Sequence, residues 1–266
     1  MTPTVFELHQ ATSPLLISMP HDGTLLAEGM AQRMTYSALR LPDTDWHVGQ
    51  LYGFARELGA GFLRPNYSRY VIDLNRPPDD VSLYPGQNTT GLCPIQQFSG
   101  EPIYLSGQEP YSAEIAQRLH DYWQPYHQAL RDEIARIRNL HGYAVVWEAH
   151  SIRSQVPFLF TGRLADLNLG TADGSSCTPA MQTALEQVLK DQTRFSWVVN
   201  GRFKGGYITR QYAQPEQSVQ VIQMELAQCN YMDEANFSYL AERAKSLQTI
   251  LRKMLEVAVS SANCHI

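Results

Sequence analysis

The sequence contains no apolar run that approaches the roughly 20 residues a helix needs to cross a bilayer. Its first ten residues include no lysine or arginine, so they lack the charged segment that opens a secretory signal. The four cysteines, Cys93, Cys177, Cys229 and Cys264, include no CxxC pair. We therefore predict no membrane span, no disulfide framework and no zinc knuckle, and we expect a cytoplasmic protein with reduced thiols.

Positive charge is also scarce, with 21 Lys and Arg against 26 Asp and Glu and a formal net charge of -5. This balance argues against a nucleic acid as partner, because binding to phosphates needs a basic face. Some of the basic residues gather in three predicted loops. They are Arg69 and Arg76, Arg153 and Arg163, and Arg202, Lys204 and Arg210. A mildly acidic protein with such loops suits a small anionic substrate, and nothing in the sequence specifies an oligomeric state.

Length and pattern together indicate the fold class. A chain of 266 residues with 44% hydrophobic and 18% charged residues fits one domain, which we place at 1–266. Short apolar runs predict strands at 15–19, 70–74, 143–149, 156–160, 195–199 and 219–226. Helical patterns separate them at 44–58, 111–140, 179–191 and 234–257. This alternation predicts an α/β fold, a single three-layer domain whose mixed, mostly parallel sheet is flanked by helices.

Three local signals refine this pattern. Asp43 or Thr44 is positioned to cap the first predicted helix, and Gly59 is positioned to end it. Pro125 is expected to kink or split the second predicted helix. The segment 75–110 is rich in Pro, Gly, Asn, Thr and Ser, and a loop of this length is usually functional.

Two histidines follow strands of the predicted sheet. His21 comes after the strand at 15–19, and His150 comes after the strand at 143–149. Ligands of open α/β sheets bind beyond the carboxyl ends of the strands, so both side chains are expected at one rim. A hydrolytic zinc site needs three protein ligands and an open position for water. The two histidines therefore predict a metal centre that requires one further ligand.

The third ligand is expected near the start of the helix that follows His21. Asp45 is the first choice because Asp43 is better placed to cap that helix, and His47 is a weaker alternative. A set of two imidazoles and one carboxylate predicts zinc, although the same donors also suit manganese, cobalt or iron.

Water activated by a metal needs a base to accept its proton. Glu225 stands near the end of an apolar strand, where a charge is costly unless it has a partner or a function. Glu148 competes for this role because it lies two residues before His150, on the same face of a continuing strand. Glu148 would otherwise orient a metal-bound imidazole.

Seven segments, taken in their order, resemble one protein family. They are ISMPHDG, LPDTDW, SRYVIDLNRPPDD, LYPGQNTTGLCP, EAHSIRS, GRLADLNLG and NGRFKGGYITR. They extend over about residues 15–231 and strongly resemble the N-formylglutamate deformylases, also called N-formylglutamate amidohydrolases, of histidine degradation. HDG or HS alone is a weak signal, whereas seven segments in one order are highly specific.

That family is similar in arrangement to the zinc carboxypeptidases and to the succinylglutamate desuccinylase and aspartoacylase group. The resemblance implies a zinc-carboxypeptidase-like fold with His21, Asp45 and His150 as metal ligands. Those relatives place their acidic ligand three residues after the first histidine, where this chain has Thr24. A threonine cannot replace that acid, and Asp45 is the substitute.

The resemblance also implies a substrate site. Asn75 and Arg76 match an Asn-Arg pair that binds a substrate carboxylate, and Glu225 matches a late glutamate that acts as base. N-formylglutamate carries two carboxylates, and arginine can bind each one through two parallel hydrogen bonds. A second cation is expected from the glycine-rich segment 201–210. The candidates there are Arg202, Lys204 and Arg210.

Arg69 or Arg153 is expected to stabilise the oxyanion that forms beside the metal. The predicted reaction is the metal-dependent hydrolysis of N-formyl-L-glutamate to formate and L-glutamate, the last step of a histidine degradation route. The alternative is a related metalloamidase that acts on another N-acyl amino acid or on a short peptide. Only the shape of the acyl pocket separates these two functions.

Overall fold

The computed structural model describes residues 3–83, 86 and 88–263. Seven strands of this part of the chain form one sheet. They are β1 (Phe6–His9), β2 (Leu15–Ser18), β3 (Gly61–Pro65), β4 (Ala144–Ile152), β5 (Leu167–Gly170), β6 (Trp197–Val199) and β7 (Val219–Ala227). Their order is β1-β3-β2-β4-β7-β5-β6, with β1 antiparallel to β3 and β5 antiparallel to β7. The remaining neighbours run parallel, which confirms the predicted mixed, mostly parallel sheet.

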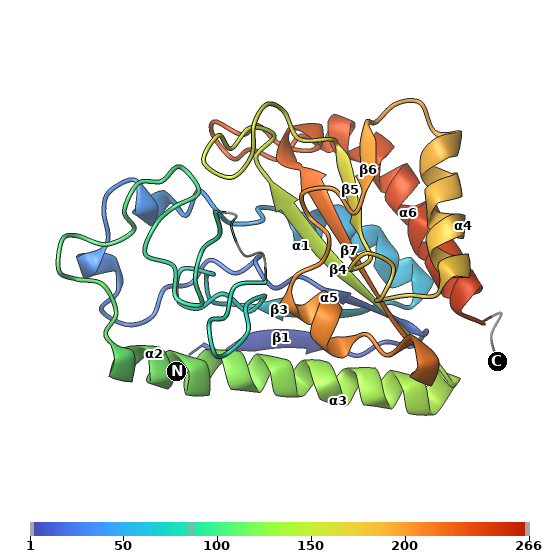
Figure 1. Cartoon of the computed structure of the whole chain (residues 1–266), viewed down its shortest axis with the longest axis horizontal. Helices are drawn as coiled ribbons and strands as arrows, with labels where there is room; N and C mark the ends of the chain where they lie inside the picture. The colour runs from blue at the N-terminus through green and yellow to red at the C-terminus, as the bar shows by residue number, and fades with distance from the viewer. Residues whose placement is uncertain (1–2, 84–85, 87, 264–266) are drawn as a thin grey trace.

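The α-helices cover both faces of this sheet (Figure 1). They are α1 (Val48–Leu51), α2 (Ser112–Arg118), α3 (Gln124–His141), α4 (Pro179–Asp191), α5 (Tyr207–Tyr212) and α6 (Ala241–Asn263). Shorter helical turns lie at Ala31–Arg33, Ala38–Arg40, Tyr52–Leu58, Leu119–Trp123, Pro215–Gln217 and Gln228–Asn230. Helix α3 lies along one side of the sheet, whereas α4 and α6 lie on the other (Figure 1). Helix, sheet and helix thus form the three predicted layers.

The central strands bury both of their faces. On β4, Val145 and Trp147 pack into the core that α1, α4 and α6 share. The alternate side chains Ala144 and Val146 pack into the core beneath α3 and α5. Successive side chains of a strand point to opposite faces, so a strand covered on both sides reads as a continuous apolar run. This is why the run at 143–149 is recognisable as a central strand.

The strand predicted at 70–74 is wrong, because that segment forms a turn. Its apolar side chains are buried, as those of a strand would be, but its carbonyls do not join a ladder. The carbonyl oxygens of Tyr70 and Val71 instead accept hydrogen bonds from Nη1 of Arg118, at 3.4 and 2.8 Å. A buried arginine from helix α2 therefore satisfies backbone groups that a neighbouring strand would otherwise have paired.

The strand predicted at 156–160 is also wrong. The backbone N–H groups of Leu159 and Phe160 both donate to the carbonyl of Val156, at 2.8 and 3.0 Å, and so close a local turn. Three further strands, β1, β3 and β5, were not predicted. Strand β3 contains glycine, arginine and proline in only five residues, and this composition masks its apolar positions.

The first predicted helix begins later than expected. Val48 opens α1, the residue before it is His47 with φ 64°, and no side chain caps the start. Asp43 is therefore not the cap, because its carboxylate accepts from the hydroxyl of Tyr70 at 2.7 Å and from a loop amide. Gly59 ends the helical segment in the left-handed conformation, with φ 71°, as predicted.

The segment 111–140 is helical and interrupted near Pro125, as predicted. A π-helical turn, Leu119–Trp123, joins α2 to α3 immediately before the proline. The wider turn accommodates a residue that has no N–H to donate and would clash with the preceding turn. Gly142 then ends α3 with φ 85°. The last helix begins at Ala241, later than the predicted 234.

The described residues of 75–110 contain no helix and no strand, which confirms a long loop. Cys93, Cys177 and Cys229 are free thiols, while Cys264 lies outside the described residues. Within the described part of the chain, no helix has the length and apolarity that a bilayer crossing requires.

Candidate metal centre and catalytic pocket

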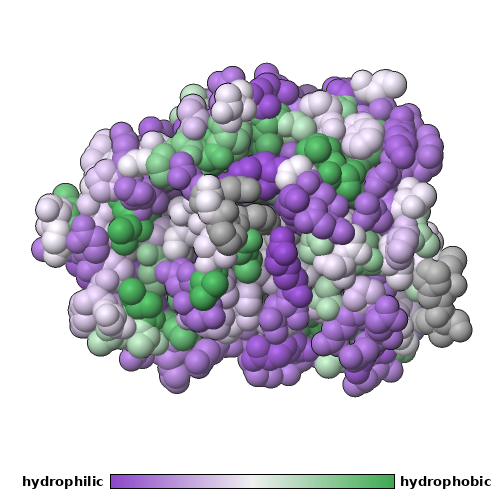
Figure 2. Space-filling view, in the orientation of Figure 1, coloured by the Kyte–Doolittle hydropathy of each residue, from purple (hydrophilic) through white to green (hydrophobic). Residues whose placement is uncertain are grey.

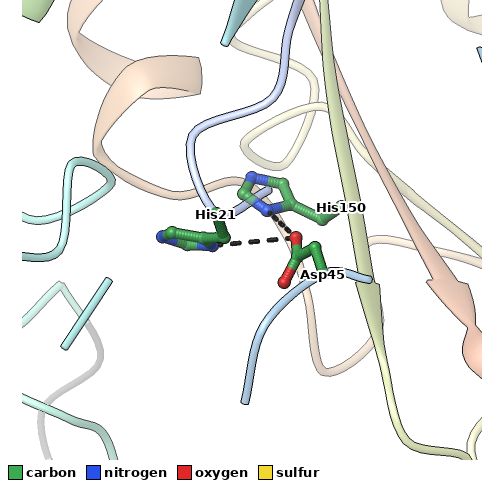
Figure 3. A group of neighbouring side chains, drawn as sticks. All are labelled: His21, Asp45 and His150. Atoms are coloured by element: carbon green, nitrogen blue, oxygen red, sulfur yellow. Dashed lines mark hydrogen bonds and ion pairs between the residues drawn. The ribbon is translucent and has the colours of Figure 1, made fainter. Parts of the chain in front are cut away.

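Three side chains converge at the carboxyl edge of the sheet. His21 follows β2, Asp45 precedes α1, and His150 lies within β4. One ligand atom from each residue lies within 4.8 Å of the other two. Nδ1 of His150 is 3.0 Å from Oδ2 of Asp45, and Nδ1 of His21 is 3.8 Å from the same oxygen. Figure 3 shows both imidazole rings directed at this carboxylate.

The sequence placed His150 just beyond its strand, and the structure places it inside. Strand β4 continues to Ile152, and His150 stands directly opposite Glu225 of β7 in the parallel register. Because β2, β4 and β7 are parallel neighbours, residues near their carboxyl ends share one rim. The sheet topology therefore brings together residues that are far apart in the sequence.

A carboxylate holds the far nitrogen of each imidazole. Nε2 of His21 lies 2.7 Å from Oδ1 of Asp73, and Nε2 of His150 lies 2.7 Å from Oε1 of Glu148. Nδ1 of each ring is then the atom that faces Asp45. Metal-ligating histidines commonly present one nitrogen to the ion and bond the other to a carboxylate. With this arrangement of hydrogen bonds, both histidines could hold a metal ion through Nδ1.

Asp45 is fixed by its neighbours rather than by a helix. Its Oδ2 accepts from the backbone N–H of Ser151 at 3.1 Å, and its own N–H donates to the carbonyl of His21 at 3.1 Å. The two alternative ligands lie elsewhere. Asp43 contacts Tyr70, and Nε2 of His47 lies 2.6 Å from a carbonyl oxygen of the segment before α6. Among the three candidates, the structure brings Asp45 to the histidines.

The pKa values of the two histidines shift in opposite directions. Burial and then the nearby charge of Arg69 lower the pKa of His21. Burial also acts against the charged form of His150, but hydrogen bonds to Asp45 and Glu148 outweigh it and raise the pKa of His150 well above its ordinary value. Two carboxylates, Asp45 and Glu148, hydrogen-bond to the ring of His150, whereas Asp73 hydrogen-bonds to the ring of His21 and Asp45 lies 3.8 Å from it.

Glu225 faces the same pocket and is 7% exposed. Burial is the main cause that raises its pKa to about 8, while the adjacent His150 acts in the opposite direction. A carboxyl group with a raised pKa has the proton affinity that an acid-base catalyst needs. Glu148 is wholly buried and does not line the pocket. Of the two glutamates that the sequence left as competing bases, Glu225 lines the pocket and Glu148 does not.

The pocket beside these residues has a volume of about 80 Å³. Arg69, Arg76 and Arg202 line it, together with polar residues of the loop 75–110. Nη2 of Arg69 donates to the second oxygen of Asp73 at 2.6 Å, and its Nη1 lies 3.2 Å from Nδ1 of His21. Arg69 holds the pKa of that buried aspartate well below its ordinary value, against the effect of burial. A buried cation thus stands next to the predicted ligand atoms.

Three other predicted cations lie outside this pocket. Lys204 forms an ion pair with Asp173 at 3.1 Å. Nε of Arg210 donates to the carbonyl of Gly205 at 3.0 Å. Arg153 lines a neighbouring cleft. Of the basic residues in the segment 201–210, Arg202 is the one that lines the pocket.

Asn75 lines the pocket, but its amide has internal partners. Nδ2 donates to Glu148 and lies 3.1 Å from Nε2 of His150, and Oδ1 accepts from the N–H of Ile208 at 2.9 Å. The hydroxyl of Thr209 donates to the other oxygen of Glu148. These bonds attach the start of α5 to the carboxylate that holds His150.

Sequence reasoning did not assign roles to Asp73 and Thr209. Asp73 stands in the apolar run YVIDL, and it carries the same signal that identified Glu225, a charge inside a buried segment. Thr209 carries no such signal, because threonine is common in every kind of element. Its role becomes visible only when α5 is packed against β4.

The fold and the site together define a class. This is a three-layer α/β protein that carries two histidines, one aspartate and a buried glutamate at the carboxyl edge of its sheet. Two imidazoles and a carboxylate are a donor set that could hold one metal ion. Figure 2 shows hydrophilic side chains gathered near the middle of one face of the molecule, below an apolar band.

The chain belongs to the N-formylglutamate amidohydrolase family, whose model matches residues 13–232. The N-formylglutamate deformylase of Pseudomonas aeruginosa is 51% identical over 253 residues, which cover 95% of each chain. That of Pseudomonas putida is 48% identical over 257 residues, which cover 96% of each chain. These relatives confirm the family that the seven segments indicated.

Solved structures share the fold. The crystal structure of N-formylglutamate amidohydrolase from Ralstonia eutropha matches with a TM-score of 0.80 at 24% identity, covering 98% of each chain. A protein of Agrobacterium tumefaciens matches with a TM-score of 0.72 at 17% identity, covering 97% of this chain and 96% of that one. At these identities the likeness concerns the fold.

Proposed function

We propose that this protein hydrolyses N-formyl-L-glutamate to formate and L-glutamate with the help of one divalent metal ion, zinc in the first place. The observation that carries the proposal is the convergence of His21, Asp45 and His150 in a pocket that arginines line. Membership of the amidohydrolase family supports the substrate, because two relatives near 50% identity bear the name N-formylglutamate deformylase. A cytoplasmic location and a place in histidine degradation stay predictions.

The residues present fit a metal ion. Two Nδ1 atoms and one carboxylate oxygen point inward, and Asp73 and Glu148 fix the far side of each ring. His21, Asp45 and His150 would hold the ion. Zinc bound there would polarise the formyl carbonyl and acidify a water molecule. Manganese, cobalt and iron also bind such donors.

Glu225 is the proposed acid-base group. Its carboxylate accepts a proton from the attacking water, whose oxygen forms the new bond to the formyl carbon. The carbon–nitrogen bond then breaks, and Glu225 returns the proton to the leaving amine of glutamate, so atoms and charge balance. Burial raises the pKa of Glu225, which gives the group the proton affinity to hold the proton between the two steps.

Arg69 is the proposed oxyanion stabiliser. Its guanidinium stands 3.2 Å from Nδ1 of His21 and is fixed by Asp73, so it is preorganised beside the reacting carbonyl. Arg153 was the alternative, and its position in the neighbouring cleft favours Arg69.

Arg76 and Arg202 are the proposed carboxylate-binding residues. Nε of Arg76 donates to the carbonyl of Thr90 at 2.8 Å, and Nη2 of Arg202 donates to the carbonyl of Asn88 at 3.0 Å. Both guanidinium groups are therefore held at the pocket by the loop 75–110.

A formate-release assay on the zinc-loaded protein tests this function. We expect release from N-formyl-L-glutamate, and a higher KM for N-formyl-L-glutamine, which has the same formyl amide and one carboxylate fewer. N-acetyl-L-glutamate should react slowly. If the protein hydrolyses other N-acyl amino acids or short peptides but releases no formate, the substrate is refuted and the related metalloamidase is supported.

A further inference from the structure

A second and larger cleft lies beside the catalytic pocket. Its volume is about 490 Å³, within the range of roughly 300–1,000 Å³ that small-molecule sites occupy. Phe98 lines both the pocket and the cleft, and the guanidinium of Arg69 stacks on its ring with Cζ 4.7 Å from the centroid. Apolar walls come from Val156, Phe158 and Phe237. The cleft has the apolar lining that ligand sites usually have.

Two arginines of the cleft approach the same aromatic ring. Cζ of Arg40 lies 5.2 Å from the centroid of Phe237, and Cζ of Arg153 lies 5.6 Å from it. Nη2 of Arg40 donates to the carbonyl of Ala235 at 3.2 Å, whereas Nε of Arg153 is buried and has no hydrogen-bond partner among the described residues. Like charges repel, so an anion bound in this cleft would offset the positive charge of two arginines that approach the same ring.

Asp43 and Glu101 also line the cleft, but neither of them supplies this negative charge. Asp43 is 7% exposed, and its carboxylate accepts from the hydroxyl of Tyr70 and the N–H of Phe98, at 2.7 and 2.8 Å. Burial is the main cause that raises the pKa of Asp43, although the charge of Arg153 acts against it. Glu101 is exposed. No carboxylate of the described residues lies within 4.0 Å of either guanidinium group of the cleft.

We propose that this cleft binds a small organic acid whose carboxylate contacts Arg40 and Arg153. An aromatic or branched apolar body of the acid would lie against Phe98, Phe158 and Phe237. Arginine binds a carboxylate through parallel hydrogen bonds, and an aromatic floor holds the guanidinium planes in place. The site is separate from the pocket proposed for N-formylglutamate, so it does not depend on that function.

Isothermal titration of the full chain with 3-phenylpropionate tests the proposal. We expect saturable binding by the wild-type protein and none of comparable strength for 3-phenylpropanamide, which has the same shape without the charge. Arg153→Met should weaken binding by about tenfold or more, because a charge-assisted hydrogen bond is worth roughly one to two powers of ten. Arg40→Met should weaken it in the same direction.

Arg194→Met is the matched control. Arg194 is an exposed arginine that also lies over an aromatic ring, 5.9 Å from the centroid of Phe195, and it lines neither the pocket nor the cleft. This variant should bind the acid as the wild type does. Circular dichroism verifies that each variant is folded, and Arg40→Met, at an exposed position, carries the test if Arg153→Met does not fold.

Three results would overturn the proposal. The first is an absence of saturable binding by the wild-type protein. The second is equal affinity for the acid and the amide, which would mean an apolar contact only. The third is binding that disappears with Arg202→Met or after metal is removed by a chelator, while Arg153→Met has no effect. That pattern would place the acid in the catalytic pocket.

Discussion

Replacing Glu148 with glutamine separates a positioning role from a catalytic one. Glu148 is wholly buried in β4, and its two oxygens contact three side chains. One oxygen lies 2.7 Å from Nε2 of His150 and also accepts from Asn75, and the other accepts from Thr209. Because Glu148 holds His150 from the side away from Asp45, we expect its loss to act through metal binding.

The expected magnitude follows from that geometry. Loss of an acidic partner of a metal-bound histidine typically weakens metal binding or activity by roughly 10–100-fold, or about 1.4–2.7 kcal/mol. The glutamine side chain would also place an NH₂ group, which is a donor, opposite the donor of Asn75 or of Thr209. Glu148→Gln should therefore raise the zinc dissociation constant, measured by competition with a chromogenic chelator. At saturating zinc, kcat should stay within about tenfold of the wild type.

Glu133→Gln provides the control, since the chemical change is the same at a remote site. Glu133 is 2% exposed on α3, where it accepts from the N–H of Ala11 and from Arg136. This variant should lower the melting temperature and leave zinc affinity unchanged. The reasoning is refuted if Glu148→Gln binds zinc as tightly as the wild type and has lost its turnover, because Glu148 would then be the base.

Other substitutions test other parts of the site. Glu225→Gln should keep zinc and lose roughly 10²–10⁴-fold in kcat, and a normal rate would remove it as base. Asp45→Asn should lose zinc on metal analysis while Asp43→Asn retains it; the reverse result would exchange their roles. Gly206→Ala should weaken zinc binding, because the added methyl group would overlap the side-chain amide of Asn75, which donates to Glu148. Gly53→Ala, where nothing lies within 4 Å, should leave zinc binding unchanged.

The parts of the fold that the sequence predicts well depend on local or periodic signals. The helix at 179–191 was predicted with the bounds that the structure shows, because Thr178 caps it and a proline opens it. The last strand was predicted from the alternation of Val219 and Val221 with Gln220 and Gln223, although both faces of β7 are buried. His21 and His150 were found because side chains near the carboxyl ends of parallel strands meet at one edge.

The parts that the sequence did not predict depend on side chains from distant elements. The segment 70–74 has a strand-like composition, and Arg118 alone shows why it forms a turn, by binding its carbonyls from helix α2. The same turn delivers Arg69 and Asp73 to His21. A pairing between positions so far apart leaves no periodic trace in the sequence, so the contact of Asp73 with His21 was missed, whereas Glu148, two residues before His150, was already a candidate partner of that imidazole.

The balance of buried charge gives a separate reason to expect a cation at this site. Asp45, Asp73, Glu148 and Glu225 are each less than 9% exposed, and Arg69 is the arginine of the pocket that is buried to the same degree. Arg69 pairs with Asp73 at 2.6 Å and lies 4.0 Å from Asp45, and His150 contacts both Asp45 and Glu148. A buried charge costs several kcal/mol unless an opposite charge compensates it. A divalent ion at the Nδ1 atoms would supply positive charge to this group and would take the place of the proton that the raised pKa of His150 otherwise holds between Asp45 and Glu148.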